Sequence, residues 1–481
     1  MRSHLRGIRT AQSGADGLRA LQFDKLIKTL EAAASSDLTA SSVQVLRDCD
    51  VRYPWNDAQA ELVVAKMLAR LPLLARGALR AKARAALTMT PAEFVHYYES
   101  SGTTGDAVAA PKALHDLVVN TMNIGEMWGR FLSPGDSALI LINGPFAPAG
   151  YQFEKVLEYI GVMSTRLWTD NVTGDYTRIL DITRELHINT FVGTASRLLE
   201  MAQFALRHGC AVPRFSRLLL MAEQTGPHLA RHLERLTGAR VYVCSYGASE
   251  TGTVAVACED GQLHLQEQSY LAEIHDDDGT RLIADGPDRG ELVLTTLDLP
   301  ARPLVRYRTG DLVEVTGKRC ECGLATPVIR PLGRAQDVLA FNGIQIRQED
   351  VEALLWPSDP TGVVVLNYML VLSGDLAVCL VTTDRRPDPD WHTALERRLA
   401  TLSPASRLAV RVVEALPPLS NMGSYVGWKL SRVLDLEDSS AWHRLPEPIR
   451  AVLEQTLTEL DAVAIPTARA GSRPHEGAVL S

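Results

Sequence analysis

Three short segments of the chain combine residue types that suit the binding of a phosphorylated nucleotide. The first, residues 100–105 (Ser-Ser-Gly-Thr-Thr-Gly), offers four hydroxyl groups to phosphate oxygens and two glycines that permit close backbone approach. No Gly-Lys-Ser/Thr sequence follows, so the segment is not a Walker A loop. Taken alone, the composition suits a plain turn after residues 94–98 equally well.

The second segment, residues 245–251 (Ser-Tyr-Gly-Ala-Ser-Glu-Thr), directly follows the apolar run Val241–Val243. Open α/β sheets bind ligands at polar loops that follow their strands. In such a loop Tyr246 could stack on a base, Thr251 could contact a phosphate, and the Glu250 carboxylate could bind Mg²⁺. The alternative is an ordinary strand-to-helix loop in which a serine caps the helix.

The third segment, residues 306–311 (Arg-Tyr-Arg-Thr-Gly-Asp), places Asp311 beside a glycine. An aspartate next to a tight turn can accept hydrogen bonds from both hydroxyls of a ribose. The alternative is a hairpin whose arginines are on the surface, because hairpin turns are common.

The elements around these segments follow an alternating pattern between about residues 94 and 300. The apolar runs are Ala138–Ile142, Thr190–Val192, Leu218–Met221 and Val241–Val243, and the helical segments are Glu154–Ile160, Arg197–Leu206 and Leu229–Leu236. This alternation predicts βα units and a largely parallel sheet. Residues 290–316 read as antiparallel strands, and residues 16–90 read as helical.

The chain is expected to divide near Gly333–Gly343. The fold class is predicted as α/β, with a large N-terminal body of mixed, largely parallel sheets and a small α+β C-terminal lid. The expected parts are a helical region of the large domain (1–90), the core (91–335), a mobile lid (336–435), and a helix with a disordered tail (436–481). The lid should contain helices at Gln348–Leu355 and Asp390–Leu399, with strands at Val363–Leu366, Leu376–Thr382 and Ala409–Val413.

Composition sets bounds on the possible functions. The chain has 481 residues. A single hydrophobic core stops growing at roughly 250–300 residues, so two or three domains are expected. The net charge of −8 gives no reason to expect a nucleic-acid partner. No stretch has the length and apolarity of a membrane span, and residues 1–20 lack the apolar core of a secretory signal, so a cytoplasmic location is expected.

The order and spacing of the three segments resemble the adenylate-forming superfamily of acyl-CoA ligases, peptide-synthetase adenylation domains and luciferases. The likeness is closest to the phenylacetate–CoA ligase branch and covers about residues 60–435. Other stretches similar to that branch are Leu71-Pro72-Leu73, Met221-Ala222-Glu223-Gln224, residues 290–295 and residues 303–308. The resemblance implies an enzyme that uses ATP and Mg²⁺ to convert a small carboxylic acid, expected to be aromatic, into an acyl-AMP, followed by transfer to CoA.

The resemblance also implies roles for individual residues. The ATP contacts would be Ser101, Thr103, Thr104 and Gly105 for phosphates, Ala222, Glu223, Gln224, Tyr246 and Gly247 around adenine, and Asp311 and Arg334 at the ribose. The catalytic residues would be Lys429, Thr251 and the Mg²⁺ ligand Glu250, and the acyl pocket would involve Phe146, Gly150, Tyr246 and Gly247. Lys429 and Mg²⁺ would balance the negative charge that develops on the phosphoryl oxygens.

Two departures from the family pattern leave the acceptor of the acyl group open. Asp106 stands where the family usually has a lysine, and Gln336 occupies the hinge position where Asp or Lys is usual. The acceptor could therefore be CoA, an amine, or the phosphopantetheine of a carrier protein, and a nucleotide-binding protein without catalysis is a third possibility. A homodimer and a role in secondary metabolism are compatible with the sequence.

The chain also holds a candidate zinc site. Cys258 and His264 follow the second segment, while Cys320 and Cys322 follow the third, and two such pairs on neighbouring loops suit a closed Cys₃His site. Spacing alone favours three reduced cysteines and an incidental histidine, because Cys-x-Cys is a weak pattern. Members of the resembled branch carry a similar set, and this likeness implies a structural zinc ion that joins the two loops.

Overall fold

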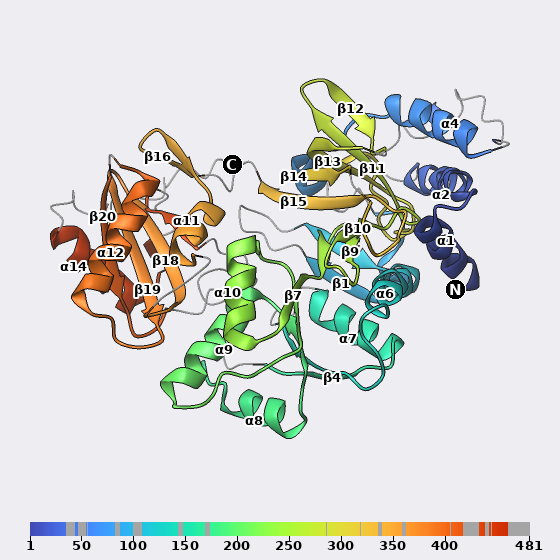
Figure 1. Ribbon diagram of the computed structural model, residues 1–481. Helices are drawn as coiled ribbons and strands as arrows, with labels where there is room; N and C mark the ends of the chain where they lie inside the picture. The colour runs from blue at the N-terminus through green and yellow to red at the C-terminus, as the bar shows by residue number, and fades with distance from the viewer. Residues whose placement is uncertain are drawn as a thin grey trace, which may run out of the picture. The chain divides into compact units, whose positions relative to one another are not determined.

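The computed structural model describes residues 1–34, 44–46, 54, 56–81, 87–99, 108–142, 148–168, 174–284, 286–317, 319–334, 339–357, 362–404, 406–416, 432–437, 442–443 and 445–459. The chain forms two compact units, one from Met1 to Asp337 and one comprising Val338–Pro417 and the chain from Ser431 onward (Figure 1). The tail predicted from Pro466 lies outside the described residues. Among the helices that are described, none has both the length and the apolar composition needed to cross a bilayer.

A five-stranded parallel sheet forms the centre of the first unit, in the order β4-β3-β5-β6-β7. Its strands are β3 (Ser137–Leu141), β4 (Met163–Arg166), β5 (Thr190–Gly193), β6 (Arg217–Leu220) and β7 (Arg240–Val243). The helices around it are α6 (Leu114–Trp128), α7 (Ala149–Tyr159), α8 (Thr177–Glu185), α9 (Ala195–Arg207) and α10 (Pro227–Thr237). The predicted βα alternation is confirmed, because neighbouring strands pair in parallel and helices connect them.

The largest sheet of this unit is antiparallel and has eight strands, in the order β12-β11-β13-β14-β15-β10-β9-β8. Its strands are β8 (Ser245–Ala248), β9 (Gly252–Ala257), β10 (Leu263–Leu265), β11 (Tyr270–Asp276), β12 (Gly279–Leu282), β13 (Asp288–Thr296), β14 (Tyr307–Thr316) and β15 (Val328–Arg334). The sequence indicated only the β13–β14 part. Most of the other strands are short, and the longer β11 and β15 contain charged or proline residues that weaken the apolar pattern.

The main core lies between the two sheets and includes α6 and α7. Trp128 of α6 stacks on Phe153 of α7, and both belong to a buried cluster with Ile140 of β3 and Val256 of β9. Figure 1 shows α8, α9 and α10 away from α6 and α7, on the other side of the parallel sheet. The two sheets therefore pack against opposite sides of one helical pair.

Helices of the N-terminal region pack on the antiparallel sheet. They are α1 (Arg2–Ser13), α2 (Leu18–Ala33), α4 (Asp57–Ala69) and α5 (Arg76–Ala81). Phe23 and Leu26 of α2 pack with Met67 of α4 and with Leu271 of β11. The helical prediction for residues 16–90 is confirmed for α2, α4 and α5, while a 3₁₀ turn (Pro91–Glu93) precedes the hairpin of β1 (His96–Glu99) and β2 (Ala109–Lys112).

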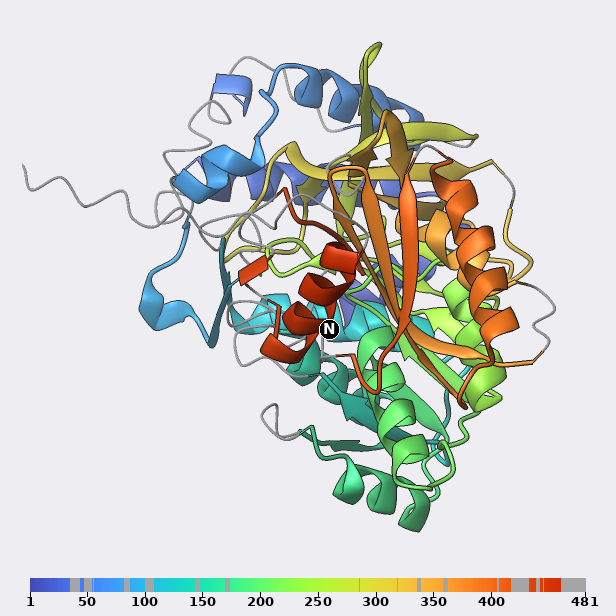
Figure 2. The ribbon, with the colours of Figure 1, turned by 90° about the vertical axis from the view of Figure 1, so that its left-hand side faces the viewer.

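The second unit is built on a four-stranded sheet in the order β20-β19-β18-β21. Its elements are β16 (Leu339–Phe341), β17 (Ile344–Ile346), α11 (Gln348–Leu355), β18 (Val365–Ser373), β19 (Leu376–Thr383), α12 (Pro389–Leu399), a 3₁₀ turn (Ala400–Leu402), β20 (Arg407–Val412), β21 (Val433–Asp435) and α14 (Glu447–Glu459). Figure 2 shows α12 and α14 on opposite sides of this sheet. The α+β pattern predicted for this region is confirmed, and β18 is longer than the predicted strand.

Candidate active site

The second predicted segment forms a tight hairpin between β8 and β9. The pairing register shifts between Tyr246 and Gly247, and a Cβ atom at Gly247 would lie 2.1 Å from the carbonyl oxygen of Gly252. Gly247 is therefore required for the close approach of the two strands. The alternative of a strand-to-helix loop capped by a serine is wrong, because a strand follows the turn at Glu250 and Thr251.

The third predicted segment lies inside the long strand β14, where Gly310 has a φ of 77°. The expected tight turn is instead a bulge, since the register between β13 and β14 shifts around Thr309 and Asp311. The hydroxyl of Thr309 donates to Leu292 O at 2.8 Å and accepts from the amide of Asp311 at 3.1 Å. The bulge thereby fixes the backbone from which the Asp311 side chain projects.

The structure brings the two segments together at one hydrogen bond. The Tyr246 hydroxyl donates to Oδ2 of Asp311 at 2.8 Å, although the residues are 65 positions apart. Tyr246 lies on β8, at one edge of the antiparallel sheet, and Asp311 lies on β14. The side chains assigned by resemblance to adenine and to ribose are therefore adjacent.

Glu250 and Thr251 are buried at the turn of the β8–β9 hairpin, 3% and 2% exposed. Oε1 of Glu250 accepts a hydrogen bond from the Tyr307 hydroxyl at 3.0 Å and lies 4.0 Å from a guanidinium nitrogen of Arg76. The Thr251 hydroxyl accepts from the amide of Ala248 at 3.0 Å and donates to Gly252 O at 3.1 Å. The turn is thus held by its own side chains, which orients Glu250.

The loop after β6 places its three predicted adenine neighbours differently. Ala222 has a φ of 64° and lines the pocket, whereas Gln224 is exposed. Glu223 accepts hydrogen bonds from the amide and hydroxyl of Ser196, at 2.9 and 2.8 Å, in the first turn of α9. A carboxylate at a helix N-terminus stabilises the helix dipole, so Glu223 has a structural contact there.

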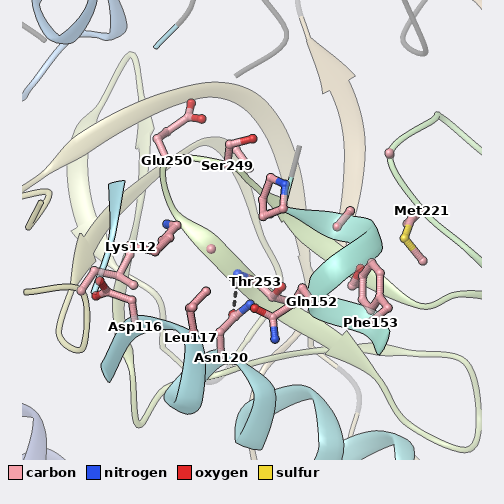
Figure 3. A pocket seen from close by; sticks show the side chains of 18 of the residues that line it. Lys112, Asp116, Leu117, Asn120, Gln152, Phe153, Met221, Ser249, Glu250 and Thr253 are labelled. Atoms are coloured by element: carbon pink, nitrogen blue, oxygen red, sulfur yellow. Dashed lines mark hydrogen bonds between the residues drawn. The ribbon is translucent and has the colours of Figure 1, made fainter. Parts of the chain in front are cut away.

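A pocket of about 970 Å³, including its open mouth, lies beside the hairpin (Figure 3). Its volume is in the range of ligand sites, roughly 300–1,000 Å³. The lining residues are Arg76, Lys112, Asp116, Leu117, Asn120, Pro148, Ala149, Gln152, Phe153, Met221, Ala222, Ser245, Gly247, Ala248, Ser249, Glu250, Gly252, Thr253 and Leu299. Figure 3 shows Lys112 and Asp116 at one end and Phe153 and Met221 at the other. Gly247 lines this pocket, and the acyl-binding role expected for it stays a prediction.

Several predicted site residues lie outside the described residues. They are Ser101, Thr103, Thr104 and Gly105 of the phosphate segment, Phe146, Lys429, and the departures Asp106 and Gln336. The backbone of Arg334 pairs with Asp311 across β14 and β15, and its side chain is not described. Gly150 lies in the first turn of α7 directly after Ala149, and it is Ala149 that lines the pocket.

The polar end of the pocket was missed by sequence reasoning. Lys112 ends β2 and is 6% exposed, and Asp116, in the first turn of α6, is 2% exposed. Burial, partly opposed by the Lys112 charge, raises the pKa of Asp116 to about 6. Burial, partly opposed by Asp116, lowers the pKa of Lys112 to about 8. A lysine closing the apolar stretch 108–111 was the available signal in the sequence.

The four predicted zinc ligands converge in the first unit. One candidate ligand atom from each of Cys258, His264, Cys320 and Cys322 lies within 4.8 Å of the other three. The Cys258 and Cys320 sulfurs are 3.6 Å apart, and the Cys322 sulfur is 3.3 Å from Nε2 of His264. Tetrahedral bonds of ~2.3 Å to sulfur and ~2.0 Å to nitrogen would separate ligand atoms by roughly 3.5–3.8 Å. The arrangement therefore has the dimensions of a Cys₃His metal site.

The surroundings of this cluster suit a metal ion. Nδ1 of His264 lies 2.9 Å from the carbonyl oxygen of Thr326, which leaves Nε2 directed at the cysteines. Burial acts to raise the pKa of Cys258, but hydrogen bonds with His264 and with backbone amides outweigh burial and lower the pKa to about 7. Burial raises the pKa of Cys320 and of Cys322, so before a metal binds only the Cys258 thiol is readily deprotonated.

Sequence comparisons give partial matches to one group of enzymes. No family model matches the chain. Phenylacetate–coenzyme A ligase from Thermus thermophilus is 38% identical over 115 residues, covering 23% of this chain and 26% of the relative. The enzyme of the same name from Pseudomonas putida is 27% identical over 308 residues, covering 61% of this chain and 66% of the relative. The matches thus span about a quarter to just under two thirds of these relatives' own length.

Structure comparison decides the fold. The structure of a 2-hydroxyisobutyryl-CoA ligase in the postadenylation state, in complex with an acyl-AMP, matches with a TM-score of 0.69 and 18% identity. The match covers 91% of both chains. The chain has the fold of the adenylate-forming ligases. The predicted fold class is confirmed, and so is the resemblance to the adenylate-forming superfamily and its phenylacetate–CoA ligase branch.

Proposed function

We propose that the protein is an adenylate-forming ligase that activates an aromatic carboxylic acid with ATP and transfers the acyl group to CoA. The hydrogen bond between Tyr246 and Asp311 carries this proposal, because it joins two distant segments to which the resemblance assigns the adenine and the ribose of one nucleotide. The adjacent pocket, which Gly247 and Ala222 also line, provides the space for the acid. Relatives named as phenylacetate–CoA ligases support an aromatic acid as substrate and CoA as acceptor.

In the first step, a carboxylate oxygen of the acid attacks the α-phosphorus of ATP, and pyrophosphate leaves with the electrons of the broken P–O bond. Tyr246 would stack on adenine while its hydroxyl holds Asp311, whose carboxylate would accept hydrogen bonds from the ribose hydroxyls. Thr251 stabilises the turn that presents Glu250. The contribution of the site is then mainly the positioning of the two reactants.

Glu250 would hold Mg²⁺, which neutralises phosphate charge when bound. Its carboxylate supplies the hard oxygen ligands that Mg²⁺ prefers, and the Tyr307 hydroxyl orients it from the protein side. In the second step, the CoA thiol loses its proton to solvent and its sulfur attacks the acyl carbon, and AMP leaves with the electrons of the broken C–O bond. Lys429 is proposed to act in the first step, where its positive charge would stabilise the negative charge that develops on the phosphoryl oxygens.

The test is a pyrophosphate-release assay with a panel of aromatic acids, run with and without CoA. Acid-dependent release, with acyl-CoA formed only when CoA is present, is the expected result. Turnover that needs an added amine or carrier protein in place of CoA would reject the CoA step and retain adenylation. Absence of release with every acid would reject the enzymatic proposal.

We also propose that Cys258, His264, Cys320 and Cys322 hold a structural zinc ion. The support is the Cys₃His donor set, the short separations of the ligand atoms and the hydrogen bond that orients His264. The ion would join the connection after β9 to the connection between β14 and β15. Metal analysis of purified protein should give about one zinc per chain, and a Cys322→Ser variant should lose it.

A further inference from the structure

Lys112 stands apart from the other buried cations of the first unit, because it faces the pocket. Its side chain is 6% exposed and lines the cavity, and no hydrogen bond or ion pair to it is found among the described residues. A buried ammonium group is costly unless an acceptor or an anion balances it. Its position therefore calls for a ligand that supplies one.

A second donor, Asn120, lines the same pocket as Lys112. The carbonyl oxygen of Asn120 accepts a hydrogen bond from the amide of Thr253 at 3.0 Å, which fixes the orientation of the side chain (Figure 3). Its NH₂ group makes no hydrogen bond within the described part of the chain, although Asn120 lines the pocket. Two donors, one from β2 and one from α6, therefore line a single pocket.

The charges around Lys112 also favour an anion. Asp116 and Glu250 supply two carboxylates near it, while Arg76 and Arg302 add two further cations. Arg302 is 3% exposed, and its guanidinium nitrogens have no hydrogen-bond partner among the described residues. Among these five groups the positive charges exceed the negative ones by one. An entering oxyanion would balance this excess in a site of low dielectric constant.

We infer that Lys112, assisted by Asn120, anchors an oxyanion of the acid substrate inside the pocket. The inference rests on the proposed function and adds a specificity-determining contact to it. The oxyanion has two possible sources: the carboxylate that reacts with ATP, or a second group on the same acid, which is a carboxylate or a phenol that loses its proton beside the Lys112 ammonium. The same donor chemistry serves both sources, and the experiment below separates them.

The test uses the full-length protein and the variants Lys112→Met and Lys112→Arg. Steady-state kinetics would compare benzoate with 4-hydroxybenzoate and terephthalate. Lys112→Met should raise the KM for the anchored acid by roughly 10- to 100-fold, the range for a lost hydrogen bond to a charged group. Lys112→Arg should recover part of the affinity, and the KM for ATP should stay unchanged, which also reports that the variant folds.

The pattern across the acids identifies the source. An equal loss for all three acids assigns the anchor to the reacting carboxylate, and a loss confined to the two substituted acids assigns it to the second group. Lys155→Met is the matched control, because Lys155 is a partly exposed lysine paired with Glu158 and should leave all values unchanged. An unchanged acid KM in Lys112→Met, or a rise in the KM for ATP alone, would overturn the inference.

Calorimetric titration of the three acids into the wild type and Lys112→Met separates this inference from the proposed function. Binding to the wild type that weakens in the variant supports the anchor even where no turnover occurs. Equal binding to both proteins, or binding to neither, contradicts the anchor whatever the activity assay gives.

Discussion

The two sheets of the first unit differ in where they carry polar side chains. The central strands of the parallel sheet, β3, β5 and β6, are mostly apolar and buried, and the candidate residues of this sheet, Ala222 to Gln224, lie in the loop after β6. The antiparallel sheet carries Tyr246, His264 and Asp311 within its own strands. Helices cover both faces of the parallel sheet, which favours apolar side chains on its central strands, whereas bulges in the antiparallel sheet orient polar side chains such as Asp311.

This difference means that a mutation should act differently in each sheet. A polar residue at the end of the parallel sheet mainly supports a helix, as Glu223 does for α9. A polar residue within the antiparallel sheet either joins distant segments or faces a ligand. The comparison between the two sheets can therefore be tested by measuring, for each substitution, the change in stability and the change in activity.

Asp298 should give the largest loss of stability. It follows β13 and accepts hydrogen bonds from Lys25 at 2.5 Å and from Ser269 at 2.8 Å. Nδ1 of His4 lies 3.8 Å from the same carboxylate. Asp298→Asn leaves Lys25 without its partner charge, so unfolding should be easier by about 3–5 kcal/mol. Chemical denaturation measures this, with Asp136→Asn beside the parallel sheet as a control of smaller effect, because the Arg217 partner of Asp136 is more exposed.

The Asp298 effect should depend on pH. Burial acts to raise its pKa, but the contacts with His115, Lys25 and His4 outweigh burial and hold the pKa below the ordinary value. A lowered folded-state pKa stabilises the protein above the unfolded value of about 3.9, and this contribution is lost as pH falls below that value. The stability difference between wild type and Asp298→Asn should therefore narrow from pH 6 to pH 3. A difference that widens on acidification would contradict the assigned charge network.

Asp311→Ala should have the next largest effect, on activity. Loss of hydrogen bonds to a charged group at both ribose hydroxyls should lower kcat/KM for ATP by roughly 100-fold. The melting temperature should change little, since Asp311 is only partly buried. Tyr246→Phe keeps the ring and removes only the hydroxyl that contacts Asp311, so its loss should be smaller. Unchanged ATP kinetics in Asp311→Ala would remove the proposed nucleotide site.

Gly247→Ala should reduce both stability and activity. The new methyl group would lie 2.1 Å from Gly252 O, so the β8–β9 hairpin must move. Overpacking of this kind costs about 1–3 kcal/mol, and the displaced turn would misplace Glu250. Gly174→Ala is a control with open space around the residue, although its positive φ also strains alanine. A fully active, stable Gly247→Ala protein would show that the close approach is not needed.

Glu223→Gln should have the smallest effect. The variant retains a hydrogen-bond acceptor for Ser196 and loses the charge at the N-terminus of α9, which is worth about 0.3–1 kcal/mol. Thermal unfolding should show this loss while the KM for ATP stays within a few-fold of wild type. A loss of ATP affinity as large as that of Asp311→Ala would place Glu223 at adenine and break the contrast between the two sheets.

Much of the fold followed from local pattern. The βα alternation and helices such as Gln348–Leu355 appear where periodicity placed them. The eight-stranded sheet was largely missed, because most of its pairings join segments whose separate patterns are weak. The segment around Gly310 was identified as a site, but its bulge depends on pairing with β13, which no local pattern specifies.

The sequence by itself determined the chemistry that is available: which segments carry hydroxyls, carboxylates and thiols, and in what order along the chain. Only the tertiary structure decided which of these groups meet. In the folded chain Tyr246 contacts Asp311, and the four candidate zinc ligands lie together. Glu223 contacts the start of α9, and Lys112 lines the pocket. The physical reason is that a short segment specifies only its own residue types and local conformation. The contacts and burial that give a side chain its role come from segments far apart in the chain.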